Sequence, residues 1–305
     1  MPANRKPGMD HDLYEWSPIT LRPPLEWPSG ASLAVVIIVS AEHFQIRPPE
    51  NAVQAASLAG GLGARPYPDY ARLSHREYGH RVGIFRVLDA LSRVNVPPTI
   101  AIDAETAERY PVIVERCLAD SAEFVAHGIA VTECITGKMS ESVEAQYIES
   151  TLNRLEHATG MRPIGWFGPE YSESSRTPKL LVQQGITYVC DWVNDEQPYR
   201  FAPAVGNLYS LPLMLEYDDA YALVTRGMSL QAYEAMVREG ASCLRRDGGE
   251  SARVLAIHVH PWLIGQPFRI GTFERILEHI VGLPDIWMAS GREVIEAFSE
   301  ASTSV

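Results

Sequence analysis

The sequence predicts an α/β fold in which helices cover a parallel sheet within a single domain, residues 1–305. Residues 33–39 are almost wholly apolar and mostly β-branched, which is typical of a strand buried on both faces. After this strand, short apolar segments alternate with longer amphipathic ones, without an internal repeat or a linker of disordered composition. A closed sheet would be a (β/α) barrel and an open one a doubly wound sheet, and this pattern alone does not separate the two.

The expected elements follow in chain order. Residues 1–30, rich in proline and aromatic residues, are expected to form an extended arm packed on the domain surface. The Pro/Gly-rich segment 45–77 is expected to be a loop with short helices that covers a site, rather than a plain connection. Strands are expected near residues 33–39, 99–102, 124–126, 163–167, 187–190, 208–213, 254–258 and 286–288. Helices are expected from residue 83 onward and over 110–119, 140–157, 178–184, 230–244, 273–281 and 292–298.

Composition excludes several classes of protein. The 305 residues, 46% of them hydrophobic, suffice for a large core. The formal net charge of −12 argues against a general nucleic-acid-binding protein, because such proteins need a basic face. No apolar run approaches the roughly 18 residues of a membrane span. The N-terminus lacks the apolar segment of a signal peptide and the cysteines are widely spaced, so a cytoplasmic protein with free thiols is expected.

Polar side chains follow most of the predicted strands. The carboxyl ends of parallel strands converge on one rim, so residues far apart in the sequence can meet there. This convergence is a stronger signal than any one residue. In chain order, the candidates for catalysis are Glu42, His127, Glu170, Asp195 and His260.

These residues also have ordinary structural interpretations. A carboxylate at a strand end is often a surface group, a single histidine such as His127 is more often packed than functional, and Glu170 can cap the following helix. His258 and His260 alternate along a strand and are expected to face opposite sides. At most one of them then points into a site, and His260 is favoured because Pro261 ends the strand.

Five segments of the sequence occur together and in the same order in a known family. They are REYGHRVG (76–83), AHG (126–128), TGMRPIGW (159–166), NDEQPY (194–199) and HPWLIGQP (260–267). Together they resemble the polysaccharide deacetylase (NodB-like) superfamily, and most closely its intracellular branch of cofactor-independent allantoinases, cyclic-imide hydrolases and related peptidoglycan-deacetylase-like proteins. The resemblance covers about residues 15–300. It implies a distorted (β/α) barrel of about seven parallel strands, and assembly as a dimer or tetramer.

The sequence departs from the metal-dependent members of this family. Those members carry an aspartate pair at the end of the first strand, where this chain has Ser40 and Glu42, and a His-x-x-x-His motif, where it has His127 and Val131. One imidazole and one carboxylate fall short of the usual three protein ligands of a catalytic zinc site. The allantoinase-like branch also lacks the second histidine and has glutamate at the position of Glu42. No metal or other cofactor is therefore expected, although Glu133 offers an unusual ligand.

The resemblance implies a hydrolase of a carbon–nitrogen bond other than a peptide bond, with a small cyclic amide, imide, ureide or N-acyl amine as substrate. Without a metal, Glu42 or Glu170 must activate the water. His127 and His260 are expected to orient water or protonate the leaving nitrogen, and Asp195 to bind substrate N–H groups or hold His127. Further substrate contacts are expected from Ser40, Glu133, Trp166, Tyr199 and Trp262.

Two alternatives remain open at this point. One is a metal-dependent carbohydrate or N-acyl deacetylase that uses Glu42, His127 and an unconventional third ligand. The other is a catalytically silent barrel that binds a saccharide or a protein partner. In the preferred interpretation the partners are a small-molecule substrate and further copies of the chain, with neither nucleic acid nor membrane.

Overall fold

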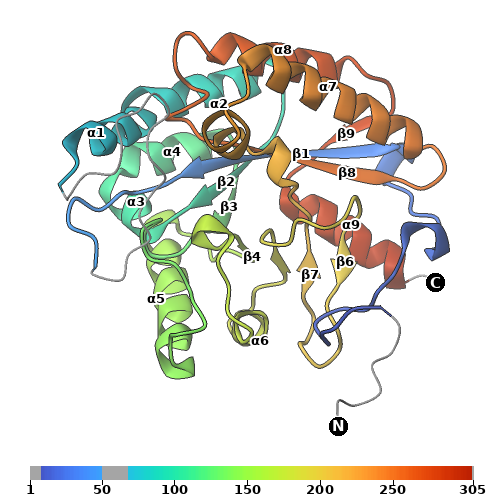
Figure 1. Cartoon of the computed structure of the whole chain (residues 1–305), viewed down its shortest axis with the longest axis horizontal. Helices are drawn as coiled ribbons and strands as arrows, with labels where there is room; N and C mark the ends of the chain where they lie inside the picture. Colours follow the sequence, from blue (N-terminus) through green and yellow to red (C-terminus); the bar gives the residue numbers. More distant parts are fainter. Residues whose placement is uncertain (1–7, 50–67, 304–305) are drawn as a thin grey trace.

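The structure is a computed structural model that describes residues 8–49 and 68–303. At its centre is a curled sheet with the strand order β6-β7-β5-β4-β3-β2-β1-β8, and β9 pairs with β1 beside this path (Figure 1). These strands pair in parallel, except that β6 and β7 are antiparallel. The sheet forms a half-barrel with helices outside it, so the predicted α/β class is confirmed, and the curl agrees with a distorted barrel.

The strands are β1 (Leu33–Ala41), β2 (Pro98–Ile102), β3 (Glu123–Ala126), β4 (Gly165–Trp166), β5 (Tyr188–Val189), β6 (Tyr199–Arg200), β7 (Tyr209–Ser210), β8 (Arg253–Val259) and β9 (Ile286–Met288). The longer helices are α1 (Tyr70–Tyr78), α2 (Ile84–Arg93), α3 (Ala104–Arg109), α4 (Pro111–Ala119), α5 (Glu141–Thr159), α6 (Thr177–Gln183), α7 (Leu230–Asp247), α8 (Ile270–Val281) and α9 (Gly291–Thr303). Short 3₁₀ turns lie at Ile19–Leu21, Pro28–Gly30, Pro169–Tyr171 and Leu215–Tyr217, and π turns at Gly79–Gly83 and Ala220–Thr225.

Strand β1 is the longest strand described and pairs with three others, and all its residues are buried. It pairs with β8 along most of its length, with β9 at its beginning and with β2 at its end. Its side chains alternate between two cores: Val35 and Ile37 pack in the outer core with residues of α2, α7 and α8, whereas Val36 and Ile38 pack in the inner core. Truncating such a residue, for example by Ile37→Ala, would cost roughly 2–5 kcal/mol of stability.

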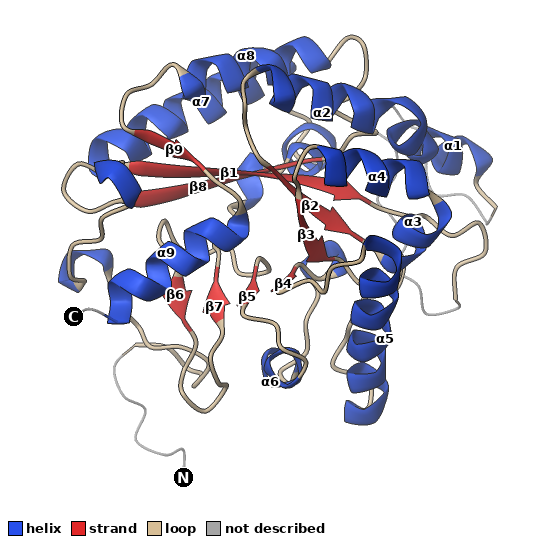
Figure 2. Cartoon of the chain, turned by 180° about the vertical axis from the view of Figure 1, so that it is seen from behind, coloured by secondary structure: helices blue, strands red, loops and turns tan. Residues whose placement is uncertain are grey.

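Helix α9 packs on the concave face of the sheet (Figure 2). Its residues Val294 and Ile295 join the inner core. The first turn of α9 is also tied to β3, because the backbone N–H of Arg292 donates to the Glu123 carboxylate over 2.8 Å. Since Glu123 begins β3, α9 occupies the end of the half-barrel where the parallel strands start. The opposite end, where the strands finish, is left for the polar residues.

Several predicted elements differ from the observed ones. Helix α3 was not expected, whereas α1 lies almost wholly in the segment 45–77, for which short helices were expected. Each has a recognisable N-cap: Asp69 accepts from Arg72 N–H over 3.2 Å and Asp103 from Thr106 N–H over 2.7 Å. Three predicted strands, 163–167, 187–190 and 208–213, form ladders of only two residues as β4, β5 and β7. The curled sheet breaks their pairing early, which an apolar run does not reveal.

The N-terminal arm packs on the domain surface over residues 8–30, as expected. Trp27 is buried, and its indole N–H donates to the Arg253 carbonyl over 2.6 Å. The predicted covering segment 45–77 lies partly outside the described residues, so its role stays a prediction. None of the helices within residues 8–49 and 68–303 is long and apolar enough to cross a bilayer.

Candidate active site

Side chains from several strand ends line one cavity of about 210 Å³. It lies where the parallel strands finish, which is the rim that the sequence predicted. Its polar lining comes from β1, β3 and β8, from α1, and from the short turns at Pro169–Tyr171 and Ala220–Thr225. The ionisable residues of the lining are Glu42, Arg76, His127, Glu170, Tyr171, Asp218, Tyr221, His258 and His260.

Glu42 follows β1 directly and lies between two imidazoles. Its Oε1 atom is 3.3 Å from His127 Nε2 and 3.5 Å from His260 Nε2. Burial alone would raise the pKa of Glu42, but His260 and His127 hold it well below its usual range. Glu42 is therefore an anion throughout the physiological pH range.

His127 follows β3, and its ring is almost completely buried. Its Nδ1 atom lies 2.5 Å from the Phe167 carbonyl oxygen. Because a carbonyl only accepts hydrogen bonds, Nδ1 carries a proton and Nε2 faces Glu42. The next residue, Gly128, has φ 73°, and a Cβ there would lie 2.3 Å from the Tyr147 hydroxyl oxygen. Glycine is therefore required for the turn that leaves His127 at the strand end.

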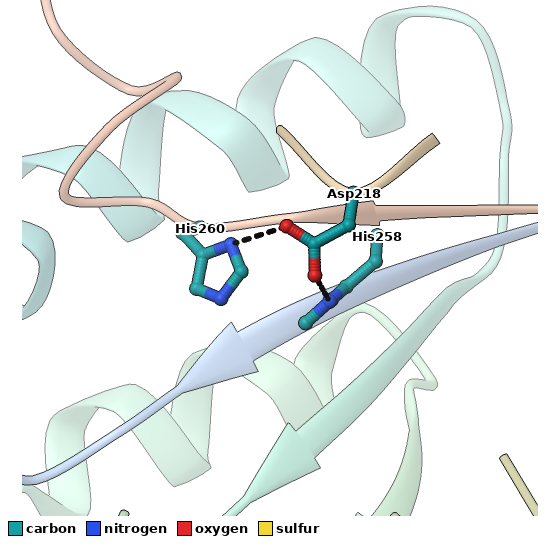
Figure 3. A group of neighbouring side chains, drawn as sticks. All are labelled: Asp218, His258 and His260. Carbon is teal, nitrogen blue, oxygen red and sulfur yellow. Dashed lines mark hydrogen bonds and ion pairs between the residues drawn. The ribbon is translucent and has the colours of Figure 1, made fainter. Parts of the chain in front are cut away.

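Asp218 and His258 in the cavity wall, and Ser40 behind it, form a buried hydrogen-bonded chain. Asp218 forms an isolated parallel bridge with His258 of β8, and its Oδ2 atom is 2.8 Å from His258 Nδ1 (Figure 3). His258 Nε2 is 2.7 Å from Ser40 Oγ. The Tyr171 hydroxyl also donates to Asp218 Oδ2 over 2.8 Å. Burial alone would raise the pKa of Asp218, but His258 and His260 lower it, so Asp218 is an anion.

His260 follows β8 and is surrounded by carboxylates. Its Nδ1 atom lies 2.7 Å from Asp219 Oδ1, and its backbone N–H donates to both oxygens of Asp219 over 3.1 Å. Its Nε2 atom faces Glu42. Burial alone would lower the pKa of His260, but the charges of Glu42, Asp218 and Asp219 raise it well above its usual value. His260 is thus an imidazolium at neutral pH, with Nε2–H directed into the cavity.

Glu170 and Arg76 complete the charged lining. Glu170 stands at the mouth with part of its surface open to solvent, and burial together with the nearby Glu42 raises its pKa. The Arg76 guanidinium lies 3.6 Å from the centre of the Trp262 ring and 4.4 Å from that of Phe44. Burial lowers the pKa of Arg76 to about 10, so it remains a cation at neutral pH. The cavity therefore has both a cationic and an anionic side.

The expectation that only one of His258 and His260 enters the site is wrong. Both line the cavity, and their ring centres are 4.3 Å apart. Strand β8 ends at Val259, so the strict alternation of a strand no longer applies at residue 260. The backbone then turns, and both rings approach Asp218.

Several predicted contacts lie elsewhere. Asp195 does not hold His127; it forms a two-pronged ion pair with Arg22 of the arm (2.8 and 2.5 Å), and both residues line a separate hollow together with Tyr199. Trp166 is fully buried in the outer core. Glu133 accepts from the Gln45 amide over 2.7 Å. Of the remaining predicted substrate contacts, Trp262 lines the cavity, whereas Ser40 lies behind it on His258.

Sequence reasoning missed Asp218, Asp219, Arg76 and Tyr171. The acidic pair at 218–219 follows the predicted strand 208–213, so the same strand-end argument would have drawn attention to it. Arg76 had a weaker signal, because it lies at the end of a segment expected to be a loop. Tyr171 directly follows the candidate Glu170, but nothing in the sequence singled it out.

The ligand positions of the metal-dependent members of the family that the sequence resembles carry other residues in this chain. Val131 stands where the second histidine would be, and it is buried and has no lone pair to offer. Within residues 8–49 and 68–303, the group with convergent ligand atoms is Asp218, His258 and His260, all within 4.8 Å of one another. Most of these atoms already have hydrogen-bond partners: His258 lies between Asp218 and Ser40, and His260 Nδ1 lies against Asp219, whereas His260 Nε2 faces Glu42.

Comparisons with known proteins agree with this architecture. Residues 77–189 match the sequence model of the polysaccharide deacetylase family. A Schizosaccharomyces pombe protein assigned to the polysaccharide deacetylases is 23% identical over 296 residues, which cover 90% of this chain and 92% of that protein. Two solved structures each cover 92% of this chain. A protein from Pseudomonas aeruginosa assigned as a polysaccharide deacetylase superposes with a TM-score of 0.83, 24% identity and 95% of its own length covered. PuuE allantoinase superposes with a TM-score of 0.81 and 23% identity, and 94% of its own length is covered.

Proposed function

We propose that this chain, which carries a polysaccharide deacetylase domain and is a hydrolase of carbon–nitrogen bonds other than peptide bonds, acts on a small cyclic amide, imide, ureide or N-acyl amine without a metal. One observation supports this most: two carboxyl groups in one cavity have pKa values displaced in opposite directions. The pKa of Glu42 is lowered, and that of Glu170 is raised. Paired groups whose environments separate their pKa values are typical of acid–base sites.

The size of the cavity supports a small substrate. Its volume of about 210 Å³ is below the roughly 300–1,000 Å³ of common ligand pockets. A single ring or one acyl group therefore fits better than an extended polymer. The Trp262 and Phe167 rings supply apolar surface for such a ligand.

In this mechanism Glu170 is the general base. Its raised pKa makes it a stronger base than Glu42, and it removes a proton from the attacking water. The water oxygen forms a bond to the carbonyl carbon, and the carbonyl electrons move to its oxygen. The Arg76 guanidinium is the cation that stabilises this oxyanion.

His260 is the general acid. Its Nε2–H gives a proton to the leaving nitrogen as that nitrogen takes the electrons of the breaking C–N bond. The products are a carboxylic acid and an amine or amide, and the proton held by Glu170 balances the one that His260 has lost. Glu42 keeps its charge throughout, orients the imidazoles of His127 and His260, and keeps His260 protonated between turnovers.

The test is a substrate screen with purified protein. The panel contains cyclic imides, ureides, N-acyl amines and acetylated sugars, each with and without prior dialysis against a chelator. We expect turnover of one of the small compounds before and after chelation, and a decrease in kcat of roughly 10²–10⁴-fold in Glu170→Gln. Failure of the folded protein to hydrolyse any compound supports the silent barrel.

The metal-dependent alternative has one observation in its favour. The Nε2 atoms of His127 and His260 both face Glu42 Oε1, while their Nδ1 atoms are hydrogen-bonded to the Phe167 carbonyl and to Asp219. Metal-binding histidines commonly have such outer partners. Turnover that chelation abolishes and zinc restores identifies this alternative as the correct one.

A further inference from the structure

The turn that carries Glu170 has an unfavourable backbone conformation. Glu170 and Tyr171 are consecutive residues with φ 54° and 57°, and neither is glycine. L-residues with side chains rarely adopt this left-handed region, and two in succession need support from their surroundings. Tyr171 also points its hydroxyl to Asp218 over 2.8 Å. The conformation of this turn therefore sets the position of Glu170 at the cavity.

The start of the turn is held by a buried aspartate. Asp191, which follows β5, accepts the backbone N–H of Gly168 over 2.7 Å through Oδ1. Gly168 is tightly enclosed, since a Cβ there would lie 2.4 Å from the Ser172 carbonyl oxygen and 3.3 Å from Asp191 Oδ1. Asp191 is therefore the side chain that fixes where the turn begins.

The other oxygen of Asp191 lies beside a second carboxyl group. Glu173 follows the same turn; the residue is partly buried, but its carboxyl oxygens are enclosed and interact with Asp191. Asp191 Oδ2 and both carboxyl oxygens of Glu173 are buried and, within the described part of the chain, have no donor partner. Two carboxylates without a cation between them cannot both stay ionised at close range, whereas one proton between them supplies the missing donor.

The surroundings of Asp191 and Glu173 favour the protonated form of these carboxyl groups. Burial and the Glu173 carboxyl raise the pKa of Asp191 well above its usual range, and the Gly168 N–H lowers it only in part. Burial raises the pKa of Glu173 to about 7, and Glu144 of α5 adds to this effect, although Glu144 is itself paired with Arg176. The nearby Trp192 indole lowers the pKa of Glu173 in part, although its N–H forms no hydrogen bond within the described residues. Of the other groups that face Asp191, Tyr171 and Cys190 stay neutral, because burial raises both of their pKa values.

We propose that Asp191 and Glu173 share one proton and, as this hydrogen-bonded pair, are the positioning residues that hold the turn at 168–171 and with it Glu170. The proposal rests on the role of Glu170 as base given above. Loss of the shared proton leaves two repelling carboxylates at the base of the turn. Asp191 then no longer holds Gly168, and Glu170 leaves its position. The site accordingly loses activity as the pH rises through the second ionisation of the pair.

The main test is Asp191→Asn. The asparagine carbonyl still accepts from Gly168, and its amide donates permanently to Glu173, so the variant keeps the geometry without a titrating proton. We expect kcat near that of wild type at neutral pH and a decline at alkaline pH that is absent or displaced upward. Asp191→Ala is the matched loss variant. It is expected to lower kcat at least tenfold with little change in KM, because binding residues such as Trp262 are untouched.

A second measurement does not depend on finding a substrate. Infrared difference spectra should contain one protonated-carboxyl C=O band in wild type at neutral pH that is missing from both Asp191→Asn and Glu173→Gln. An unchanged band in both variants, or the same alkaline decline in Asp191→Asn as in wild type, overturns the proposal. If Asp191→Asn does not fold, the spectrum of Glu173→Gln alone tests the proposal: the protonated-carboxyl band is expected to be missing, and an unchanged band overturns the proposal. If the band is lost in the variants but the wild-type protein hydrolyses no compound of the panel, the shared proton is supported and the proposed function is rejected.

Discussion

Replacing Glu42 by glutamine is expected to lower the pKa of His260. The change removes one negative charge 3.5 Å from His260 Nε2 while keeping the size of the side chain. With an effective dielectric constant of about 20, a unit charge at that separation contributes roughly 5 kcal/mol. This is an upper bound of about 3.5 pKa units, since one unit is about 1.4 kcal/mol.

Two further variants make this prediction quantitative. Asp219→Asn removes a carboxylate 2.7 Å from His260 Nδ1 and is likewise expected to lower the pKa of His260. Asp195→Asn is the control, because Asp195 is paired with Arg22 outside the cavity. The assay is an NMR titration of the imidazole carbon and nitrogen signals. A neutral His260 in wild type at pH 7, or a pKa that stays unchanged in Glu42→Gln, refutes the reasoning.

The same interaction predicts how stability changes with pH. The pKa of His260 is raised in the folded state, so its contribution to the free energy of unfolding is complete below its unfolded pKa of about 6.5. This contribution is lost as the pH rises through the folded pKa. Urea unfolding of wild type and Glu42→Gln is therefore expected to give a difference in stability that is larger at pH 6 than at alkaline pH.

Three further predictions concern other parts of the molecule. His127, which the sequence predicts to orient the attacking water, is tested by His127→Ala, which is expected to lower kcat by roughly 10²–10⁴-fold. The same change is expected to cost about 1–3 kcal/mol of stability, because the Phe167 carbonyl loses its donor. Turnover and melting temperature measured on one sample check both, and a near-normal rate contradicts this role of His127. Extensive dialysis against a chelator is expected to leave melting temperature and turnover unchanged, and elemental analysis that finds about one zinc, nickel or cobalt per chain contradicts this. Gly83→Ala places a Cβ 2.0 Å from the Pro261 carbonyl oxygen and is expected to lower the unfolding free energy by roughly 1–3 kcal/mol. Gly137→Ala is the control: its Cβ would lie in open space, and the unfolding free energy is expected to change by less than about 0.5 kcal/mol. Urea titrations of both variants measure the two changes.

The sequence predicted the fold class and part of the site for a clear physical reason. Buried parallel strands read as apolar runs, and the residue after each run is placed at one rim by the fold itself. Glu42, His127 and His260 were located in this way. The expected positions of Trp166 and Asp195 were wrong for two different reasons. Trp166 belongs to a strand of two residues, which is too short to determine which way a side chain points. Asp195 pairs with Arg22, a residue remote in sequence, and a local pattern does not reveal such a contact.

Two kinds of feature were beyond the reach of a single sequence. The pairing of Asp218 with His258 depends on an isolated bridge between a loop and β8, which local patterns do not encode. The alternatives for the base, Glu42 or Glu170, differ through buried charges around them, and these are set by tertiary packing. The expected homo-oligomer and the role of segment 45–77 stay predictions.

The pairing of β1 also has a consequence for synthesis of the chain on the ribosome. This apolar strand ends at residue 41, but β8, its partner along most of its length, begins only at residue 253. At about 5–20 residues per second, translation separates the two by roughly 10–40 s. During that interval one edge of the most hydrophobic segment of the chain has no native partner, and exposed edges of this kind promote aggregation. Efficient production of this protein is therefore expected to depend on chaperones that bind early nascent chains, and a shorter delay, as in a circular permutant that places β8 before β1, should relieve that dependence.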